Sequence, residues 1–245
     1  MDVHAHTPTA RKKWTHYFWE FLMLFLAVFC GFLAEYKLEH KIEKDRGKQY
    51  AKSMYDDLKM DTAQLNSVIQ ARVKRNEMLD SLFHLIDNPQ NYLSDLYFYA
   101  RHITRTAPVT FFNNDRTIQQ LKNSGGLRLI ANRNVSDSII LYDQQVRLIQ
   151  NRQDGELENT RECFQFCAKI FNSRVFEKMI NADNVLFRPA GNPELLKYSE
   201  QDINSFLGYL QLVKANNMSN NYFTKFLQIK AVNLLKTIKN EYHLE

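Results

Sequence analysis

The stretch that decides the fold is Trp14–Leu38, with the sequence WTHYFWEFLMLFLAVFCGFLAEYKL. From Trp14 to Ala34 it is a run of 21 residues, mostly apolar or aromatic, in which Glu20 is the one acid. As a helix these 21 residues would extend about 31 Å, close to the thickness of the hydrocarbon layer of a bilayer. Tryptophan and tyrosine residues lie near both ends, at the depth where such rings prefer to sit. We therefore expect residues 14–38 to form a single transmembrane helix.

A cleaved signal peptide is the main alternative for this stretch. Its uncharged centre, Phe21–Ala34, is long for the apolar region of a signal peptide, and no small-x-small cleavage site follows it. A lipoprotein signal would need small residues directly before Cys30, where Phe29 stands. We therefore predict an uncleaved anchor in the lipid bilayer, preceded by a polar cytoplasmic tail at residues 1–13.

The basic residues on the two sides of the span give two readings of its orientation. Three basic residues precede it as the compact cluster Arg11–Lys13, and five follow it mixed with acids. A strict count of five against three favours a cytoplasmic location for residues 39–245. Long domains, however, cross membranes largely regardless of charge, and the cluster without acids lies on the N-terminal side. We therefore expect the N-terminus inside and the C-terminal domain outside.

Four residues of the span are candidates for packing against another membrane helix. Glu20 lies one turn inside the apolar run, where a carboxylate is costly unless it reaches the interface, a partner, or His16 four residues earlier. Ala27, Gly31 and Ala34 are small residues of the kind that let two helices approach closely. A glutamate at headgroup depth is the structural alternative for Glu20; a contact to another membrane subunit is the functional one.

The remaining residues, 39–245, predict an extramembrane α-helical bundle domain. Only 7 Gly and 5 Pro occur in the whole chain, which argues against a β-sandwich, a barrel or a long disordered tail. Apolar residues from Tyr50 to Ile86 recur at steps of mostly three and four, so the membrane helix is expected to continue into a long stalk helix, with Gly47 as a point where it could bend. The expected fold is all-α: an N-terminal transmembrane helix, its stalk, and an antiparallel helical bundle.

The helices of the bundle can be placed from the same periodicity and from capping residues. We expect a helix over residues 92–105, a short helix capped by Asn114 or Asp115, and a long one over 135–180 that Gly155 loosens. A loop follows at 182–198. Ser199, with Asp202 three residues later, predicts the start of another helix, and the asparagines of residues 216–221 predict a turn before the last helix.

One group of residues resembles a known family. The motif T-F-x5-T-x3-L-x2-S-G-G-L-R-L-I-x-N runs from Thr110 to Asn132. It is similar to a motif in a family of uncharacterised bacterial proteins with one N-terminal transmembrane helix and a helical extramembrane domain, a domain of unknown function. Members also tend to carry a glutamate early in the span. The resemblance covers roughly residues 14–150 and implies a shared architecture, without an activity. With the anchor, it leads us to expect a bacterial inner-membrane protein with a periplasmic C-terminal domain.

Within this motif, Ser124, Gly125, Gly126 and Arg128 form a loop that could contact a partner or a ligand. Arg128 beside the Gly-Gly backbone could bind an anion, although a phosphate-binding loop needs a different spacing. The alternative is a partly buried arginine that ties the loop to helix carbonyls or to an acid.

No catalytic constellation is visible, so we expect no enzyme, no catalytic residue, no cofactor and no metal. The carboxylates Asp56, Asp57 and Asp61 are interpreted as solvated residues on the polar face of the stalk. Cys163 and Cys167 are interpreted as two buried helical thiols, with a redox pair or half of a metal site as the alternative. The net charge of +5 is spread among interleaved acids and bases, which is typical of a solvated surface, and we expect no nucleic-acid partner.

The intact anchor, the stalk and the missing active site together favour a membrane-anchored helical scaffold or accessory subunit. Its expected partners are another membrane protein or a second copy of the chain. The alternative is an extracytoplasmic ligand-sensing domain that signals through a partner membrane protein.

Overall fold

The computed structural model describes residues 14–87, 89, 92–105 and 108–244, and it confirms the all-α fold. The elements are α1 (Trp14–Ile86), α2 (Leu93–Arg105), α3 (Arg116–Asn123), the 3-10 helix η2 (Gly126–Leu129), α4 (Arg133–Ile170), α5 (Ser173–Lys178) and α6 (Glu200–Tyr242). The described residues contain no β-strand, only an isolated bridge between Ile180 and Leu186. The predicted tail, residues 1–13, lies outside the described residues.

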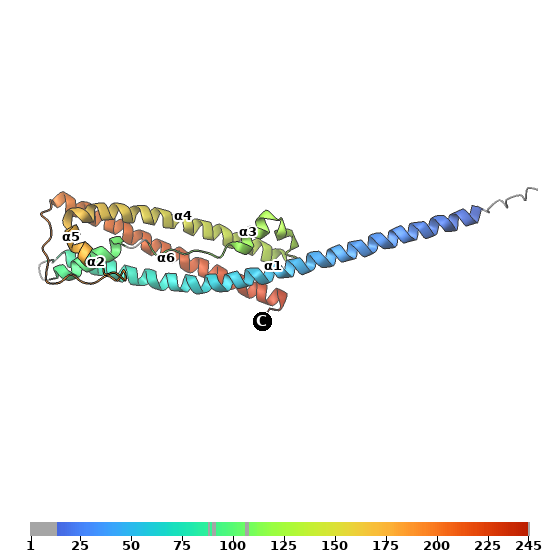
Figure 1. Cartoon of the computed structure of the whole chain (residues 1–245), viewed down its shortest axis with the longest axis horizontal. Helices are drawn as coiled ribbons and strands as arrows, with labels where there is room; N and C mark the ends of the chain where they lie inside the picture. The colour runs from blue at the N-terminus through green and yellow to red at the C-terminus, as the bar shows by residue number, and fades with distance from the viewer. Residues whose placement is uncertain (1–13, 88, 90–91, 106–107, 245) are drawn as a thin grey trace, which may run out of the picture.

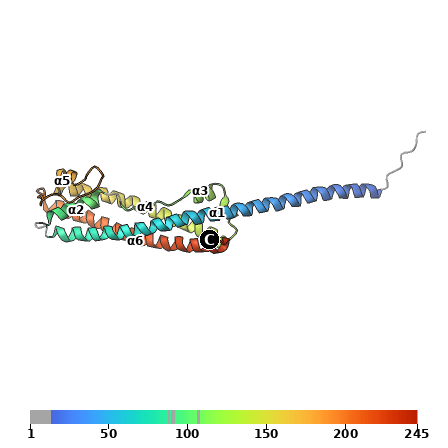
Figure 2. The ribbon, with the colours of Figure 1, turned by 60° about the horizontal axis from the view of Figure 1, so that its bottom comes forward.

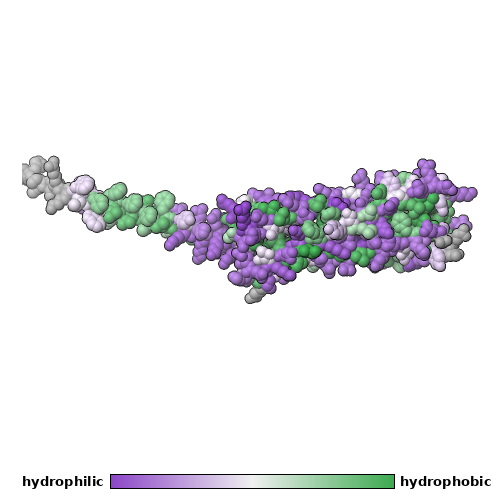
Figure 3. Space-filling view, turned by 180° about the vertical axis from the view of Figure 1, so that it is seen from behind, coloured by the Kyte–Doolittle hydropathy of each residue, from purple (hydrophilic) through white to green (hydrophobic). Residues whose placement is uncertain are grey.

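Helix α1 continues without a break from the apolar segment into the bundle. Its 73 residues correspond to a length of about 110 Å. It is the one helix in the described part of the chain that is long and apolar enough to cross a bilayer. Figure 3 shows the apolar part standing apart from the bundle, with a hydrophilic section between the two. The rings of Phe21, Phe25 and Phe29 stack along one side of this free part, with centroids 6.2 and 5.9 Å apart.

The bundle consists of three long helices capped by short elements at its two ends (Figures 1 and 2). Helix α6 packs along both α1 and α4 and runs antiparallel to them. Helices α2 and α5 lie at the end far from the apolar segment, and α3 and η2 lie at the near end. Helix α4 runs in the same direction as α1, because the chain first returns along the bundle from α2 to α3.

That return is made by the extended segment 108–115, which contacts both α1 and α4. Its backbone accepts a hydrogen bond from Arg72 of α1 and donates one from Phe111 N to Gln153 Oε1 of α4, 2.7 Å long. Farther on, the backbone N–H of Asn114 donates to Asp61 of α1. Buried backbone N–H and C=O groups need hydrogen-bond partners. In this segment side chains of α1 and α4 supply them, because the segment forms no helix of its own.

Two separate apolar cores fill the bundle. The near core includes Leu58 and Leu65 of α1, with residues of α3, α4 and the C-terminal half of α6. The far core includes Leu79 and Leu82 of α1, with residues of α2, α4, α5 and the N-terminal half of α6. Polar residues occupy the interior between the two cores.

Two of the expected helix boundaries are wrong. The helix predicted over 135–180 ends at Ile170, because Phe171 takes an extended conformation that buries its ring and Asn172 then caps α5. Gly155 does not interrupt α4. The turn predicted at 216–221 is absent, and α6 continues through it, because Asn217 and Asn220 bond to residues on other helices instead of to their own backbone. The capping box predicted at Ser199 and Asp202 is confirmed.

Gly47 marks the place where α1 enters the bundle, and the helix continues through it without a break. A Cβ atom at residue 47 would lie 2.1 Å from the backbone oxygen of Leu129, far inside van der Waals contact. The close approach of α1 to η2 therefore requires glycine at this position.

Replacing Gly47 by alanine is expected to lower the free energy of unfolding by about 1–3 kcal/mol, because backbone must shift to admit the methyl group. Gly155→Ala is the matched control, since nothing lies within 4 Å of a Cβ atom there and alanine favours a helix. Urea unfolding of the detergent-solubilised protein, followed by circular dichroism, measures both. Equal stability of the two variants would contradict the close contact.

Candidate functional site

A layer of buried polar side chains separates the two cores of the bundle. On each long helix the polar residues continue the three- and four-residue spacing of the apolar residues on either side. Between Val68 and Leu79, α1 contributes Arg72 and Arg75. The other buried members are Gln153, Glu156 and Thr160 of α4, and Asn217, Asn220 and Thr224 of α6. We call these eight residues the polar layer.

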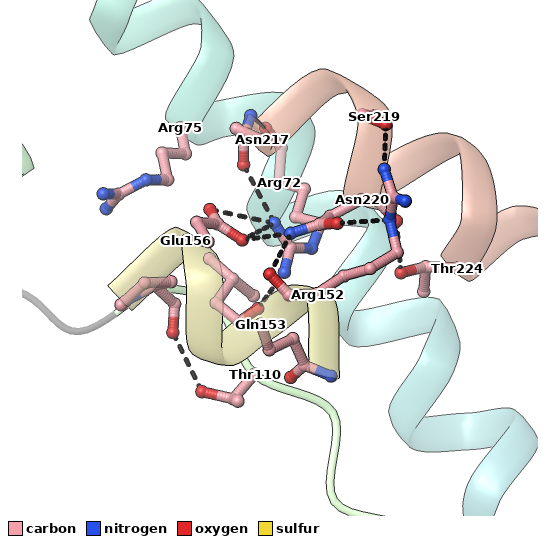
Figure 4. Close-up of polar contacts among 12 residues, drawn as sticks. Arg72, Arg75, Thr110, Arg152, Gln153, Glu156, Asn217, Ser219, Asn220 and Thr224 are labelled. Carbon is pink, nitrogen blue, oxygen red and sulfur yellow. Dashed lines mark hydrogen bonds and ion pairs between the residues drawn. The ribbon is translucent and has the colours of Figure 1, made fainter. Parts of the chain in front are cut away.

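Arg72 is the centre of the polar layer (Figure 4). Its Nη1 lies 3.1 and 2.9 Å from the two carboxylate oxygens of Glu156 and 3.3 Å from Asn217 Oδ1. Its Nη2 donates to the backbone oxygen of Val109. Arg72 and Glu156 are 1% and 0% exposed, so each depends on the other for charge compensation.

Asparagines of α6 complete the connections among the three long helices. Asn217 Nδ2 donates to the backbone oxygen of Arg72, at 2.9 Å, and Asn220 Nδ2 donates to Glu156 Oε2, at 2.7 Å. Arg152 of α4 adds an outer contact, since it donates to Asn220 Oδ1 and Ser219 Oγ and lies over the ring of Phe223. Arg72 of α1 thus contacts both Glu156 of α4 and Asn217 of α6, and Glu156 also contacts Asn220 of α6. The polar layer therefore fixes the register of α1, α4 and α6.

A second buried polar group corrects the interpretation of Asp57 and Asp61. Both carboxylates are 1% exposed, whereas the sequence had suggested solvated residues. Asp57 accepts from the backbone N–H of Thr117 in the first turn of α3, and Asp61 accepts from Asn114 and from the hydroxyl of Tyr142. Burial raises the pKa of Asp61 above its ordinary value, although these hydrogen bonds counteract the shift. The extended segment 108–115 and α3 cover this face of α1. The sequence of α1 alone does not show that these distant segments bury Asp57 and Asp61.

The four candidate residues of the span lie on the free part of α1. Glu20 Oε1 lies 3.2 Å from His16 Nε2, so the local pair expected from their spacing is present. Ala27, Gly31 and Ala34 are exposed, and a Cβ atom added at Gly31 would meet nothing within 4 Å. The structure therefore leaves this face of small residues accessible to another helix.

The candidate loop, Ser124–Arg128, closes α3 and forms η2. Gly125 has φ +66°, which a residue with a side chain rarely adopts, and Ser124 Oγ donates to the backbone oxygen of Gln120. Gly126 is buried against Tyr50 of α1. Arg128 is exposed, and its Nη2 lies 3.5 Å from Glu43 Oε1. Three residues of this loop thus have local structural roles, and Arg128 ties it to an acid of α1.

Arg128 also lines a pocket of about 560 Å³ at the end of the bundle nearest the apolar segment. The pocket lies among α1, η2 and the C-terminal end of α6. Both basic and acidic groups line it: His40, Glu43, Lys44, Lys48, Arg128, Glu241 and His243. Because the charges nearly balance, the lining does not select a ligand of one sign.

The remaining chemical candidates are structural. Cys163 and Cys167 are free and fully buried in the far core, and burial raises the pKa of both above the ordinary value, that of Cys163 to about 12. Within the described ranges no group of three or more His, Cys, Asp or Glu side chains is placed to hold a metal ion.

An exposed apolar stripe on α6 is a surface that the sequence analysis missed. Met218, Tyr222, Phe226 and Ile229 follow steps of four, four and three, so they share one face of the helix. Their exposed fractions are 55, 69, 40 and 59%. The signal is present in the sequence as a second apolar periodicity, but the turn predicted at 216–221 interrupts it. We call these four residues the α6 stripe.

Comparison with protein-family models, with curated proteins and with solved structures gave no match. The resemblance to a bacterial family with one transmembrane helix therefore stays a prediction.

Proposed function

We propose that the protein is a membrane-anchored helical scaffold or accessory subunit. Residues 14–38 would hold it in the bacterial inner membrane, with the bundle in the periplasm. The observation that supports this function best is the continuity of α1, which joins the apolar segment and the bundle in a single helix. A bundle attached in this way would keep a fixed distance and direction relative to the bilayer, as a scaffold requires.

The α6 stripe supplies the surface for a partner. Four large apolar side chains in a row are unusual on the outside of a soluble helix, and such patches mark contact sites. The inward face of α6 is already occupied by the polar layer and the two cores. The stripe fits an apolar face of another membrane protein's extramembrane domain or of a second copy of this chain.

A photoreactive amino acid placed at residue 222 tests this proposal in native membranes. We expect illumination to link the chain covalently to its partner, and the adduct mass separates a second copy from a different protein. The matched control is the same amino acid at Glu158, which is exposed on α4. Absence of any adduct at 222, from a protein that is folded and in the membrane, would overturn the α6 stripe as a partner surface.

Ligand sensing is a second candidate, favoured by a cavity among basic side chains at the far end of the bundle. In that function the bundle would bind a small molecule and pass the signal to a partner membrane protein. The site of such a ligand is developed below.

A further inference from the structure

A small cavity of about 280 Å³ opens between α1, α2 and the loop before α6, at the far end of the bundle. Its lining divides into two kinds of side chain. Lys74, His102 and Arg105 are basic, and Met78, Phe98 and Leu186 are apolar. His102 and Arg105 lie on one face of α2 with Phe98, at steps of four and three.

The basic side chains around this cavity repel one another. The pKa of His102 lies below its ordinary value because burial and the nearby charges of Arg75, Arg105 and Lys74 all disfavour the imidazolium. The pKa of Arg101 is lowered by burial and by Arg105. Five cationic or potentially cationic side chains thus crowd around the same end of α2.

Two acids on the same helices pair with cations that do not line the cavity. Asp95 of α2 is bound to Arg188, whose guanidinium covers the ring of Phe98. Asp80 of α1 is bound to Lys214 of α6. Glu156 raises the pKa of Arg75, but it is already the partner of Arg72 in the polar layer.

Arg105 also carries an unused donor. Its Nη2 donates to the backbone oxygen of Asn184, 3.0 Å away, which orients the guanidinium. Its Nη1 is buried and has no hydrogen-bond partner in the described part of the chain. A buried donor without an acceptor is costly, and an anion that reached it would supply the acceptor.

We propose that this cavity binds a small organic anion, a carboxylate or a phosphate ester, whose apolar body lies against Phe98, Met78 and Leu186. Arg105 and Lys74 hold the anionic group. The arrangement is that of ligand pockets in general, with apolar walls and a few convergent polar groups. The site goes beyond the scaffold function and does not depend on it.

Binding of benzoate and phenyl phosphate to the full-length protein in detergent, measured by isothermal titration calorimetry, tests the site. Benzyl alcohol is the control that has the aromatic ring but no charge. Inorganic phosphate is the control that has the charge but no apolar group. We expect both organic anions to bind, and both to bind more tightly than benzyl alcohol and inorganic phosphate do.

Arg105→Gln and Lys74→Gln are each expected to weaken binding of the organic anions about tenfold or more, because a charge-assisted hydrogen bond is lost. Lys74 is exposed, so its replacement leaves folding intact even if Arg105→Gln does not fold. Arg161→Gln, at an exposed position on α4, is the control and should bind like the unmodified protein.

Three results would overturn the proposal. The first is no binding of either organic anion. The second is equal binding of benzyl alcohol, which would reveal an apolar crevice without anion recognition. The third is an equal loss in Arg161→Gln and Lys74→Gln, which would reveal attraction to the overall positive charge. None of these outcomes bears on cross-linking at residue 222, so the two proposals fail separately.

Discussion

Replacing Glu156 by alanine is expected to lower the free energy of unfolding by about 3–5 kcal/mol, because Arg72 would be left as a buried charge without its counter-ion. The carboxylate of Glu156 is fully buried and accepts hydrogen bonds from both Arg72 and Asn220. Its removal takes the carboxylate acceptor from both donors, which keep only longer contacts: Arg72 Nη1 to Asn217 Oδ1 at 3.3 Å and Asn220 Nδ2 to the backbone oxygen of Arg152 at 3.4 Å. Denaturant titration of the detergent-solubilised protein, followed by circular dichroism, measures the loss.

Two further variants separate the buried pair from other effects of the substitution. Glu158→Ala, an exposed acid two residues along α4, should change stability by about 0.5 kcal/mol at most. The double variant Arg72→Met with Glu156→Leu removes both charges, and it should recover most of the loss, because a buried ion pair contributes little beyond its apolar replacement. Recovery should be incomplete, since Asn220 still loses its short hydrogen bond to Glu156 and keeps only the longer one to the backbone oxygen of Arg152. A loss below about 1 kcal/mol in Glu156→Ala would contradict the dependence of Arg72 on this carboxylate.

Two arginines in the middle of the apolar segment should release the protein from membranes. Leu24 and Val28 lie one turn apart near its centre, and each Arg substitution there costs about 2.5–3.5 kcal/mol of insertion free energy. Leu24→Arg with Val28→Arg is therefore expected to shift most of the protein from the membrane fraction to the soluble fraction. Flotation of cell membranes after carbonate washing measures the distribution.

The bundle should remain folded in that released protein. Leu24 and Val28 are 70 and 62% exposed and touch neither core, so the thermal transition of the bundle should not move. Leu24→Ala with Val28→Ala is the control and should stay in the membrane. Retention of the double arginine variant in carbonate-washed membranes would contradict the anchor.

Sequence reasoning predicted what depends on neighbouring residues. The uncharged run Phe21–Ala34 and the periodicity beyond it predicted α1, and the side chains of Ser199 and Asp202 predicted the start of α6. These features arise from contacts within one helix or one turn, and the sequence displays them directly.

The polar layer could not be predicted in the same way, because its partners are far apart in the chain. Asn217 lies 145 residues from Arg72, and Asn220 lies 64 residues from Glu156. Asparagine favours turns when its side chain bonds locally, so the pattern at 216–221 predicted a turn. The steps of three and four from Leu210 through Asn217 and Thr224 to Leu227 continue without interruption, and they were the available sign of a continuous helix.

Because α1 is continuous through residues 38–47, the number of residues in this section determines the direction in which the bundle faces relative to the apolar segment. Each residue of an α-helix advances about 1.5 Å and rotates about 100° around the axis. One residue inserted between Leu38 and Gly47 would therefore turn the α6 stripe by more than a quarter of a circle around an anchored helix. Seven inserted residues would lift the bundle by about 10 Å and return the stripe to within about 20° of its original bearing. In the proposed membrane-anchored scaffold, the length of this short hydrophilic section therefore sets both the height of the α6 stripe above the bilayer and the direction in which the stripe faces.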